Sequence, residues 1–167
     1  SVDDIRPKGF TSYITDQNGT VLETLKDSDS NRVYKTYDEI TANTKYLPHA
    51  FVAIEDERFY EHNGIDLQGI IRAGVVGVMN GFNFSEGAST LTQQLIKNNV
   101  FDFVNEKTFF DKVERKLQEQ YLALAVEKEM SKEEIIELYM NTINLGQGCY
   151  GVQTASKGIQ LDQIQIL

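Results

Sequence analysis

The sequence GASTLTQQLIKN, residues 87–98, begins with a glycine typical of a loop and continues as a helix. On that helix Thr90, Gln94 and Lys97 fall at positions i, i+4 and i+7, so a hydroxyl, an amide and an ammonium group share one face. The face lies beside a helix N-terminus, whose free N–H groups favour anions, and it would suit a phosphate. The alternative is a capped amphipathic helix that packs its leucines in a core, and this pattern alone favours that alternative.

A second segment with candidate chemistry is EDERFYEHNG, residues 55–64. On a helix, Glu55, Phe59 and His62 fall at i, i+4 and i+7, so a carboxylate is flanked by an aromatic ring and an imidazole. A carboxyl group in such surroundings can be desolvated enough to hold a proton near neutral pH, as general acid or base catalysis requires. The alternative is that Glu55 and Asp56 are solvated charges that pair with the following arginine, and spacing alone favours it.

The third segment is RKLQE, residues 115–119. Its spacings, Arg115 to Glu119 and Lys116 to Glu119, are those of ordinary surface ion pairs, which contribute little to stability. The next residues, YLALAV, are apolar on every side of the helix, which predicts a buried helix. Glu119 is therefore expected where an exposed helix enters the core, a place where it could line the floor of a cleft.

Three other segments are first of all structural. KEEIIELYMN, residues 132–141, predicts a core helix, and NLGQGCYGVQTAS, residues 144–156, predicts a turn whose glycines allow close backbone approach. The best apolar stretch covers residues 69–84 and is short, rich in glycine and interrupted by an arginine. It is typical of a core helix that runs into a loop; the alternative is a flexible element that dips into a bilayer surface.

The pattern along the chain predicts a short β-hairpin followed by helices. The runs TSYIT and TVLETL flank Asp16-Gln17-Asn18-Gly19, and Asn-Gly between alternating apolar runs is a strong hairpin signal. The later boundaries are expected as follows: a capping box at Thr36 and Glu39, a helix from Pro48 through His62, a helix over Leu67–Met79, a loop over Asn80–Gly87, a helix opened by Thr90 and Gln93, a helix over Asp111–Met130, a helix from the capping box of Ser131 and Glu134 through Tyr139, and a tight turn within Asn144–Gly151.

Composition bounds what the chain can be. Its 167 residues fit one domain, or one domain that lacks an edge, and 41% hydrophobic residues can bury an ordinary core. A net charge of −9 argues against nucleic acid as a partner, so any anion site must be a local cluster. The only cysteine, Cys149, excludes an internal disulfide and a cysteine-ligated zinc site. No apolar run is long enough for a membrane-spanning helix.

Taken together and in this order, the five segments resemble the five motifs of the peptidoglycan glycosyltransferases, which occur in class A penicillin-binding proteins and monofunctional transglycosylases. The match covers about residues 46–156, and GASTLTQQLIKN agrees almost letter for letter. The resemblance implies a single domain over residues 1–167 with a mainly α, lysozyme-like, two-lobed fold. A small N-terminal β-hairpin region would cover residues 1–35, and residues 69–87 would be the mobile, membrane-proximal segment of the smaller lobe.

The resemblance also implies substrate and roles. The substrate would be lipid II, a disaccharide-pentapeptide on a polyprenyl pyrophosphate, polymerised into β-1,4-linked glycan with inversion at the donor anomeric carbon and release of polyprenyl pyrophosphate. Glu55 would be the general base on the acceptor 4-hydroxyl, and Glu119 the second essential carboxylate, which places the donor or its cations. The remaining substrate-binding residues, by position in the motifs, would be Lys97, Arg115 and Lys116 at the pyrophosphate, together with Thr90, Gln94, Ser89, His62, Phe59 and Asp56.

The chain departs from the family pattern in places. Some members carry an arginine four residues before the arginine of the third motif, where this chain has Asp111; the adjacent Lys112 is the candidate replacement. After Ala155 the family continues with an aromatic pair, whereas this chain has Ser156-Lys157-Gly158, so we expect a truncated C-terminal edge. The N-terminal membrane anchor of the family is missing as well, which predicts an excised fragment.

The resemblance implies lipid II, the growing lipid-linked glycan and the membrane surface as partners, and a C-terminal transpeptidase domain if the parent protein is bifunctional. It places the chain at the extracytoplasmic face of the bacterial cell membrane. It implies no required cofactor; whether Mg²⁺ or Mn²⁺ assists the pyrophosphate stays open, because no ligand set is visible. Two other functions remain open, a lysozyme-like muramidase with Glu55 as general acid and a non-catalytic cell-wall binding module.

Overall fold

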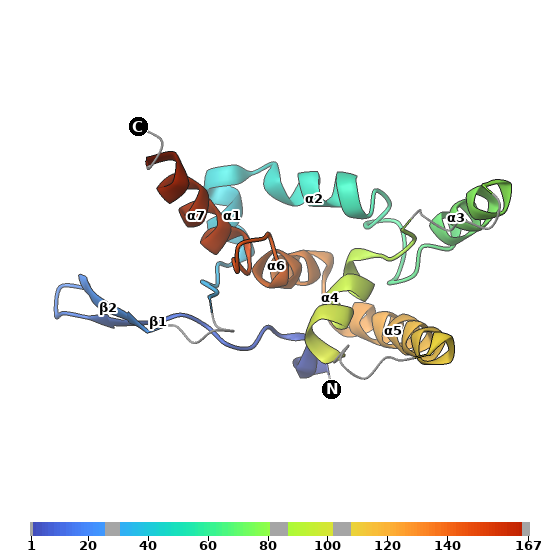
Figure 1. Ribbon diagram of the computed structural model, residues 1–167, viewed down its shortest axis with the longest axis horizontal. Coiled ribbons are helices and arrows are strands. Elements are labelled where there is room, and N and C mark those ends of the chain that lie inside the picture. Colours follow the sequence, from blue (N-terminus) through green and yellow to red (C-terminus); the bar gives the residue numbers. More distant parts are fainter. Residues whose placement is uncertain (1, 26–30, 81–86, 102–107, 165–167) are drawn as a thin grey trace.

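The computed structural model describes residues 2–25, 31–80, 87–101 and 108–164, and these form a helical body with one β-hairpin (Figure 1). The mainly α fold with a small N-terminal hairpin is therefore confirmed. The elements of the described part are, in chain order, the 3-10 helix η1 Val2–Ile5, the strands β1 Ser12–Thr15 and β2 Val21–Leu25, and the helices α1 Tyr37–Thr44, α2 Leu47–Glu55, α3 Leu67–Met79, α4 Leu91–Val100, α5 Phe109–Glu129, α6 Lys132–Thr142 and α7 Val152–Ile164.

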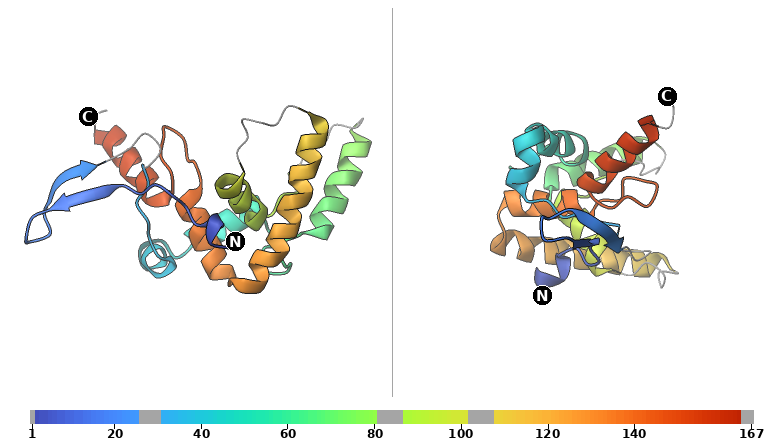
Figure 2. Two further views of the ribbon diagram at one scale, coloured as in Figure 1. Left: turned by 90° about the horizontal axis from the view of Figure 1, so that it is seen from below. Right: turned by 90° about the vertical axis from the view of Figure 1, so that its left-hand side faces the viewer.

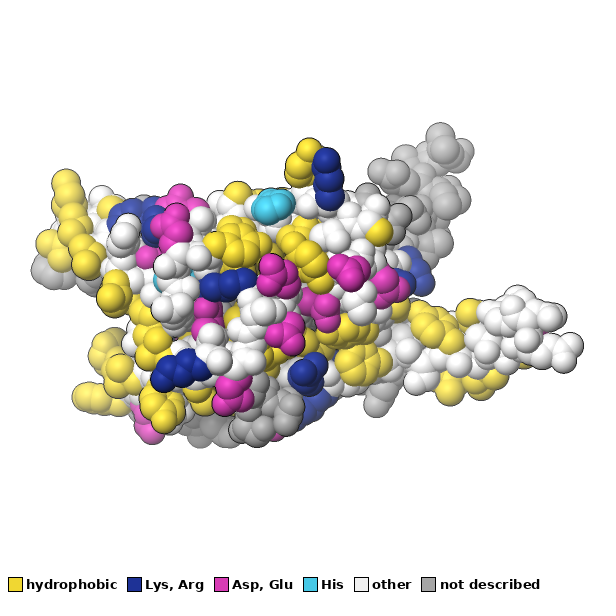
Figure 3. Space-filling view, turned by 180° about the vertical axis from the view of Figure 1, so that it is seen from behind, with side chains coloured by type: hydrophobic (Ala, Val, Ile, Leu, Met, Phe, Trp, Pro, Cys, Tyr) yellow, Lys and Arg dark blue, Asp and Glu magenta, His cyan; other side chains and the backbone are white. Residues whose placement is uncertain are grey.

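The hairpin forms around the predicted Asn-Gly turn. The Asp16 carboxylate accepts hydrogen bonds from the backbone N–H groups of Asn18 (2.8 Å) and Thr20 (2.9 Å), and Gly19 has the positive φ of +82° that this turn needs. Every residue of β1 and β2 is exposed. The hairpin projects from the helical body (Figures 1 and 2), and Figure 3 shows apolar side chains along it.

The core lies where α4 packs against both α5 and α6. Its central side chains are fully buried: Leu91, Leu95 and Ile96 of α4, Ala123 of α5, and Ile135, Ile136 and Met140 of α6. The packed leucines expected of the helix after Gly87 are thus present. The capping boxes predicted at Thr36 with Glu39 and at Ser131 with Glu134 are both formed and begin α1 and α6, which confirms those boundaries.

Two predictions about helices were wrong. The helix expected to run through His62 ends at Glu55, because Asp56 leaves helical geometry (φ −161°, ψ 73°). The Asp56 carboxylate then accepts hydrogen bonds from a ring nitrogen of His62 and from the backbone N–H of Leu91, and these long-range contacts replace another helical turn. The all-round burial expected of YLALAV is also wrong, since Tyr121 is 75% and Leu124 40% exposed; α5 packs on α4 along one side.

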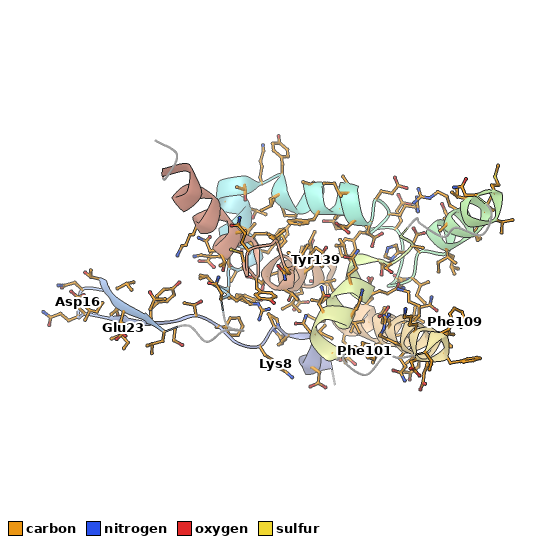
Figure 4. All side chains as sticks on the ribbon, viewed as in Figure 1. Lys8, Asp16, Glu23, Phe101, Phe109 and Tyr139 are labelled. Atoms are coloured by element: carbon orange, nitrogen blue, oxygen red, sulfur yellow. The ribbon has the colours of Figure 1, made fainter. Side chains whose placement is uncertain are left out.

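The helices α3 and α5 each carry an exposed apolar stripe. On α3, Ile71, Val75, Val78 and Met79 are all more than half exposed, and Figure 2 shows this helix at the edge of the molecule. The first turn of α5 adds the exposed Phe109, which points away from the helix in Figure 4. In the part of the chain that the structure describes, no helix is long and apolar enough to cross a membrane. The bounds predicted for α3 are confirmed, and residues 81–86 of the expected loop lie outside the described residues.

Candidate active site

Glu55 stands at the C-terminal end of α2 with its side chain exposed. It lines a small cavity of about 150 Å³, together with Arg58, Arg72 of α3 and Ser89. Its carboxylate oxygen Oε2 accepts a hydrogen bond from Nε2 of Gln94 on α4 (3.1 Å). An exposed carboxylate beside one fixed N–H donor remains free to take a proton from a bound molecule.

The Gln94 amide connects Glu55 to α5. Its Nε2 also lies 3.4 Å from the backbone oxygen of Ser89, and the Ser89 hydroxyl accepts a hydrogen bond from Nζ of Lys116 (2.6 Å). Lys116 in turn donates to Oε2 of Glu119 at 2.9 Å. The Glu55 carboxylate is therefore connected to Lys116 of α5 through the Gln94 amide and through the two oxygens of Ser89, its backbone carbonyl and its hydroxyl.

Glu119 is fully buried and paired with two cations. Arg115 donates to its Oε1 and Lys116 to its Oε2, while the Arg115 and Lys116 side chains keep 16% and 38% of their surface exposed. The interpretation of these residues as an ordinary surface ion pair was therefore wrong, whereas Glu119 does lie where α5 enters the core. A buried carboxylate held by two cations fixes where those cations can point.

The three residues predicted to share one face of α4 do not share one environment. Thr90 caps the helix and is 1% exposed; its hydroxyl donates to the backbone oxygen of Gly64 (2.8 Å) and accepts from the backbone N–H of Gln93 (3.2 Å). Gln94 is half-buried, and Lys97 is exposed in the last turn. The Thr90 side chain is thus used inside the protein, and Gln94 and Lys97 are the accessible pair.

The common face predicted for Glu55, Phe59 and His62 is also wrong, because α2 has ended before Phe59. Phe59 is fully buried, and Nε2 of His62 is bonded to the Asp56 carboxylate (2.9 Å). The other ring nitrogen, Nδ1, accepts from the backbone N–H of Gly64 (3.2 Å), which leaves Nε2 as the nitrogen that donates to Asp56. Together these residues form a layer beneath the cavity.

Lys132, at the start of α6, contacts both His62 and Phe59 of this layer. Its ammonium group donates to the backbone oxygen of His62 (2.7 Å), pairs with the buried carboxylate of Glu127 (2.5 Å) and lies 4.3 Å from the centre of the Phe59 ring. The sequence predicted only a core helix here. No local pattern marks Lys132, because each of its partners lies on another segment.

Arg58 pairs with neither Glu55 nor Asp56, although the sequence left that pairing open. It pairs with Glu57 and, at 2.5 Å, with Asp66, the N-cap of α3, while Arg72 of α3 pairs with Glu57 at 3.1 Å. The hydrogen bonds from Arg58 lower the pKa of Asp66 below its usual value. This network joins α3 to the segment that follows α2, and it leaves the Glu55 carboxylate unpaired with any cation in the described part of the chain.

No group of three metal-ligating side chains occurs in residues 2–25, 31–80, 87–101 and 108–164. The other carboxylates that line the cavity have partners: Asp56 in His62, Glu57 in Arg58 and Arg72, and Asp66 in Arg58. Glu55 is thus an exposed carboxylate that Gln94 and Ser89 connect to Lys116, one of the two cations that hold Glu119 on α5.

Comparison with known proteins identifies the family of this chain. The transglycosylase family matches residues 18–162. The chain is 45% identical over 149 residues to penicillin-binding protein 1A of Clostridium perfringens, and 39% identical over 173 residues to that of Clostridium novyi; these alignments cover 87% and 100% of this chain and 20% of each relative. Penicillin-binding protein 1A of Clostridium tetani is 38% identical over 159 residues, which is 93% of this chain and 19% of that relative. The chain thus spans about a fifth of the length of these relatives, and the match confirms the resemblance drawn from the five motifs: this chain belongs to the transglycosylase family, the peptidoglycan glycosyltransferases.

Proposed function

We propose that this chain polymerises lipid II into β-1,4-linked glycan. The observation that carries the proposal is the hydrogen-bond chain from the exposed carboxylate of Glu55, through Gln94 and Ser89, to Lys116. It connects an exposed carboxylate to a lysine, which supports the roles of base and cation that we assign to them. Transfer of a sugar from a pyrophosphate needs a base, because a sugar hydroxyl is a poor nucleophile. It also needs a cation, because negative charge collects on the departing pyrophosphate, which is otherwise a good leaving group.

In the proposed reaction, Glu55 takes the proton of the acceptor 4-hydroxyl. The acceptor oxygen forms a bond to the anomeric carbon of the growing chain as the bond from that carbon to the pyrophosphate oxygen breaks, and attack from the opposite face inverts the carbon. Negative charge then collects on the departing polyprenyl pyrophosphate. Lys97, Arg115 and Lys116 are the cations proposed to stabilise that charge.

The other predicted site residues act from a distance in this proposal. Glu119 has no exposed surface, so it orients Arg115 and Lys116 and does not touch the sugar. Asp56 and Thr90 border the cavity with almost no exposed surface, and together with Phe59 and His62 they hold the segment that follows Glu55 in place. A muramidase is supported less well, because Glu119, the second carboxylate of the motifs, is already paired with two cations and cannot serve as base or nucleophile.

The test is incubation of the chain with labelled lipid II in detergent, followed by separation of the products. Glycan polymer together with polyprenyl pyrophosphate supports the proposal. Cleavage of finished glycan, with no polymer from lipid II, would favour the muramidase, and binding of glycan with neither reaction would favour a non-catalytic module.

Glu119→Gln is expected to lower the polymerisation rate by up to about 100-fold, because Arg115 and Lys116 lose the charge that fixes them. We also expect the free energy of unfolding to fall by about 1–3 kcal/mol, since one charged hydrogen bond is lost in a buried place. Urea denaturation and the lipid II assay measure the two effects.

Glu114→Gln is the matched control for this substitution, because Glu114 is an exposed carboxylate on the same helix. It is expected to change the free energy of unfolding by less than about 0.5 kcal/mol. If Glu119→Gln behaves as Glu114→Gln does, the role proposed for Glu119 is wrong.

We further propose that the exposed apolar stripe of α3 contacts the membrane surface, which would place the site near a lipid-linked substrate on the extracytoplasmic face. In the longer parent protein, a transpeptidase domain would follow.

The double variant Ile71→Glu with Val75→Glu is expected to weaken flotation with liposomes at least about tenfold, because two exposed apolar side chains become charged. Leu22→Glu on the hairpin, also an exposed apolar position, is the control and should float as the parent does. Failure of the parent to float with anionic and neutral liposomes alike contradicts the membrane contact.

A further inference from the structure

Tyr139 lies just beneath the site without reaching its surface. It is 1% exposed, at the centre of the body in Figure 4, and its ring packs edge-on against Phe51 of α2 with 5.7 Å between ring centres. Its hydroxyl donates to Oε1 of Gln94 (3.2 Å). Burial, and next the charge of Glu55, raise the pKa of Tyr139 well above its usual value, so the phenol keeps its proton and remains a donor at every working pH.

The Gln94 amide has a donor end and an acceptor end, and its surroundings accept only one orientation. The carboxylate of Glu55 and the backbone oxygen of Ser89 are both acceptors, and both face Nε2. If the amide turned over, Oε1 would meet these two oxygens without a proton between them. The Tyr139 hydroxyl holds Oε1 on the opposite side and so selects the orientation in which N–H faces Glu55.

We propose that Tyr139 is a positioning residue that fixes the Gln94 amide and thereby keeps an N–H donor on the Glu55 carboxylate. The inference rests on the proposed function, because the donor matters to the reaction only if Glu55 is the base. A hydrogen bond to the charged form of a carboxyl group favours that form. Tyr139 therefore acts on the Glu55 carboxylate through the Gln94 amide, without touching substrate.

Other charged groups surround Glu55, and a Tyr139→Phe substitution changes none of them. They are Asp56, Glu57, Arg58 and Asp66 on the segment between α2 and α3, Arg72 on α3, and Lys116 on α5 through Ser89. The phenylalanine keeps the ring that packs on Phe51 and removes only the hydroxyl. A change in the pH dependence can then be assigned to the Gln94 amide.

The test is the pH dependence of kcat/KM for polymerisation by the parent and by Tyr139→Phe. We expect the acidic limb of the profile to move to higher pH by about half a unit to one unit, and the rates at alkaline pH to stay close to those of the parent. Tyr34→Phe is the matched control, because it removes the hydroxyl of a second tyrosine, which is partly buried, bonded to Glu137 at 2.5 Å and absent from the lining of the cavity. Its profile should equal that of the parent.

A double-mutant cycle separates positioning from general packing. In a Gln94→Ala background, Tyr139→Phe should produce no further shift of the acidic limb, because the amide through which it acts is gone. Additive shifts would overturn the inference. An unchanged pH profile for Tyr139→Phe would also overturn the inference, provided that the parent polymerises lipid II and Glu55→Gln does not.

A readout without turnover keeps the inference testable if the proposed function fails. The side-chain N–H signals of Gln94 in ¹⁵N-labelled protein, assigned by their absence in Gln94→Ala, should respond to pH as Glu55 ionises. In Tyr139→Phe this response should be lost or strongly reduced. An unchanged response overturns the inference, whereas absence of polymer from the parent, or full activity of Glu55→Gln, counts only against the proposed function.

Discussion

Glu55→Gln is expected to lower polymerisation of lipid II by about 100- to 10,000-fold, the usual contribution of a general base. The amide has nearly the shape of the carboxylate but cannot take the acceptor proton. Because Glu55 is exposed and its hydrogen-bond partner is the neutral amide of Gln94, the substitution should change the free energy of unfolding by less than about 0.5 kcal/mol. The loss is therefore expected in kcat, with binding of lipid II retained.

Glu61→Gln provides the control for this experiment. Glu61 is exposed, belongs to the segment that follows Glu55 and does not line the cavity, so its activity should match the parent. Rates are measured from labelled lipid II, and circular dichroism checks that each variant is folded. A Glu55→Gln protein that polymerises at the parent rate would show that another group is the base.

Gly64→Ala is expected to destabilise the protein by about 2–5 kcal/mol. Gly64 has φ +92°, and a Cβ atom there would lie 2.7 Å from the backbone carbon and oxygen of Ala123 in α5. Its backbone oxygen also accepts hydrogen bonds from the side chains of Thr90 (2.8 Å) and Gln93 (3.2 Å), so a shift of this residue disturbs the start of α4 as well. Urea denaturation measures the loss.

Gly146→Ala isolates the cause of that destabilisation. Gly146 has the same φ of +92°, but nothing lies within 4 Å of the position of its Cβ. It should therefore show only the backbone cost, about 1 kcal/mol. Equal losses for the two variants would mean that contact with Ala123 is not what makes Gly64 necessary.

Much of the fold was predictable because its boundaries are set by local chemistry. The capping residues Thr36, Thr90 and Ser131 each begin a helix where the sequence predicted one, and the Asn-Gly turn forms the hairpin. Each of these signals acts within four residues. They could therefore be recognised before any tertiary contact was known.

The end of α2 was not predictable in this way. The helical spacing of Glu55, Phe59 and His62 was genuine, but Asp56 forms its bonds with His62 and with Leu91, 35 residues further along the chain. The apolar residues that follow Glu119 placed it correctly where α5 enters the core, but its complete burial was not predictable, for the same reason. Its spacing to Arg115 and Lys116 is that of a surface pair, and only the packing of α5 on α4 removes it from solvent.

The ties beneath the cavity also bear on the order in which the molecule folds. Lys132 reaches the backbone oxygen of His62 across 70 positions of the chain, and Tyr139 reaches Gln94 across 45. Closing loops of this length costs entropy before any contact offsets it, so these ties form after the local helices. Both depend on α6, which a ribosome makes after every other segment of the site. A nascent chain without α6 can contain helical α2 and α4, yet it lacks the contacts that hold His62 and Gln94. The proposed site is therefore complete only after the last third of this chain has been synthesised.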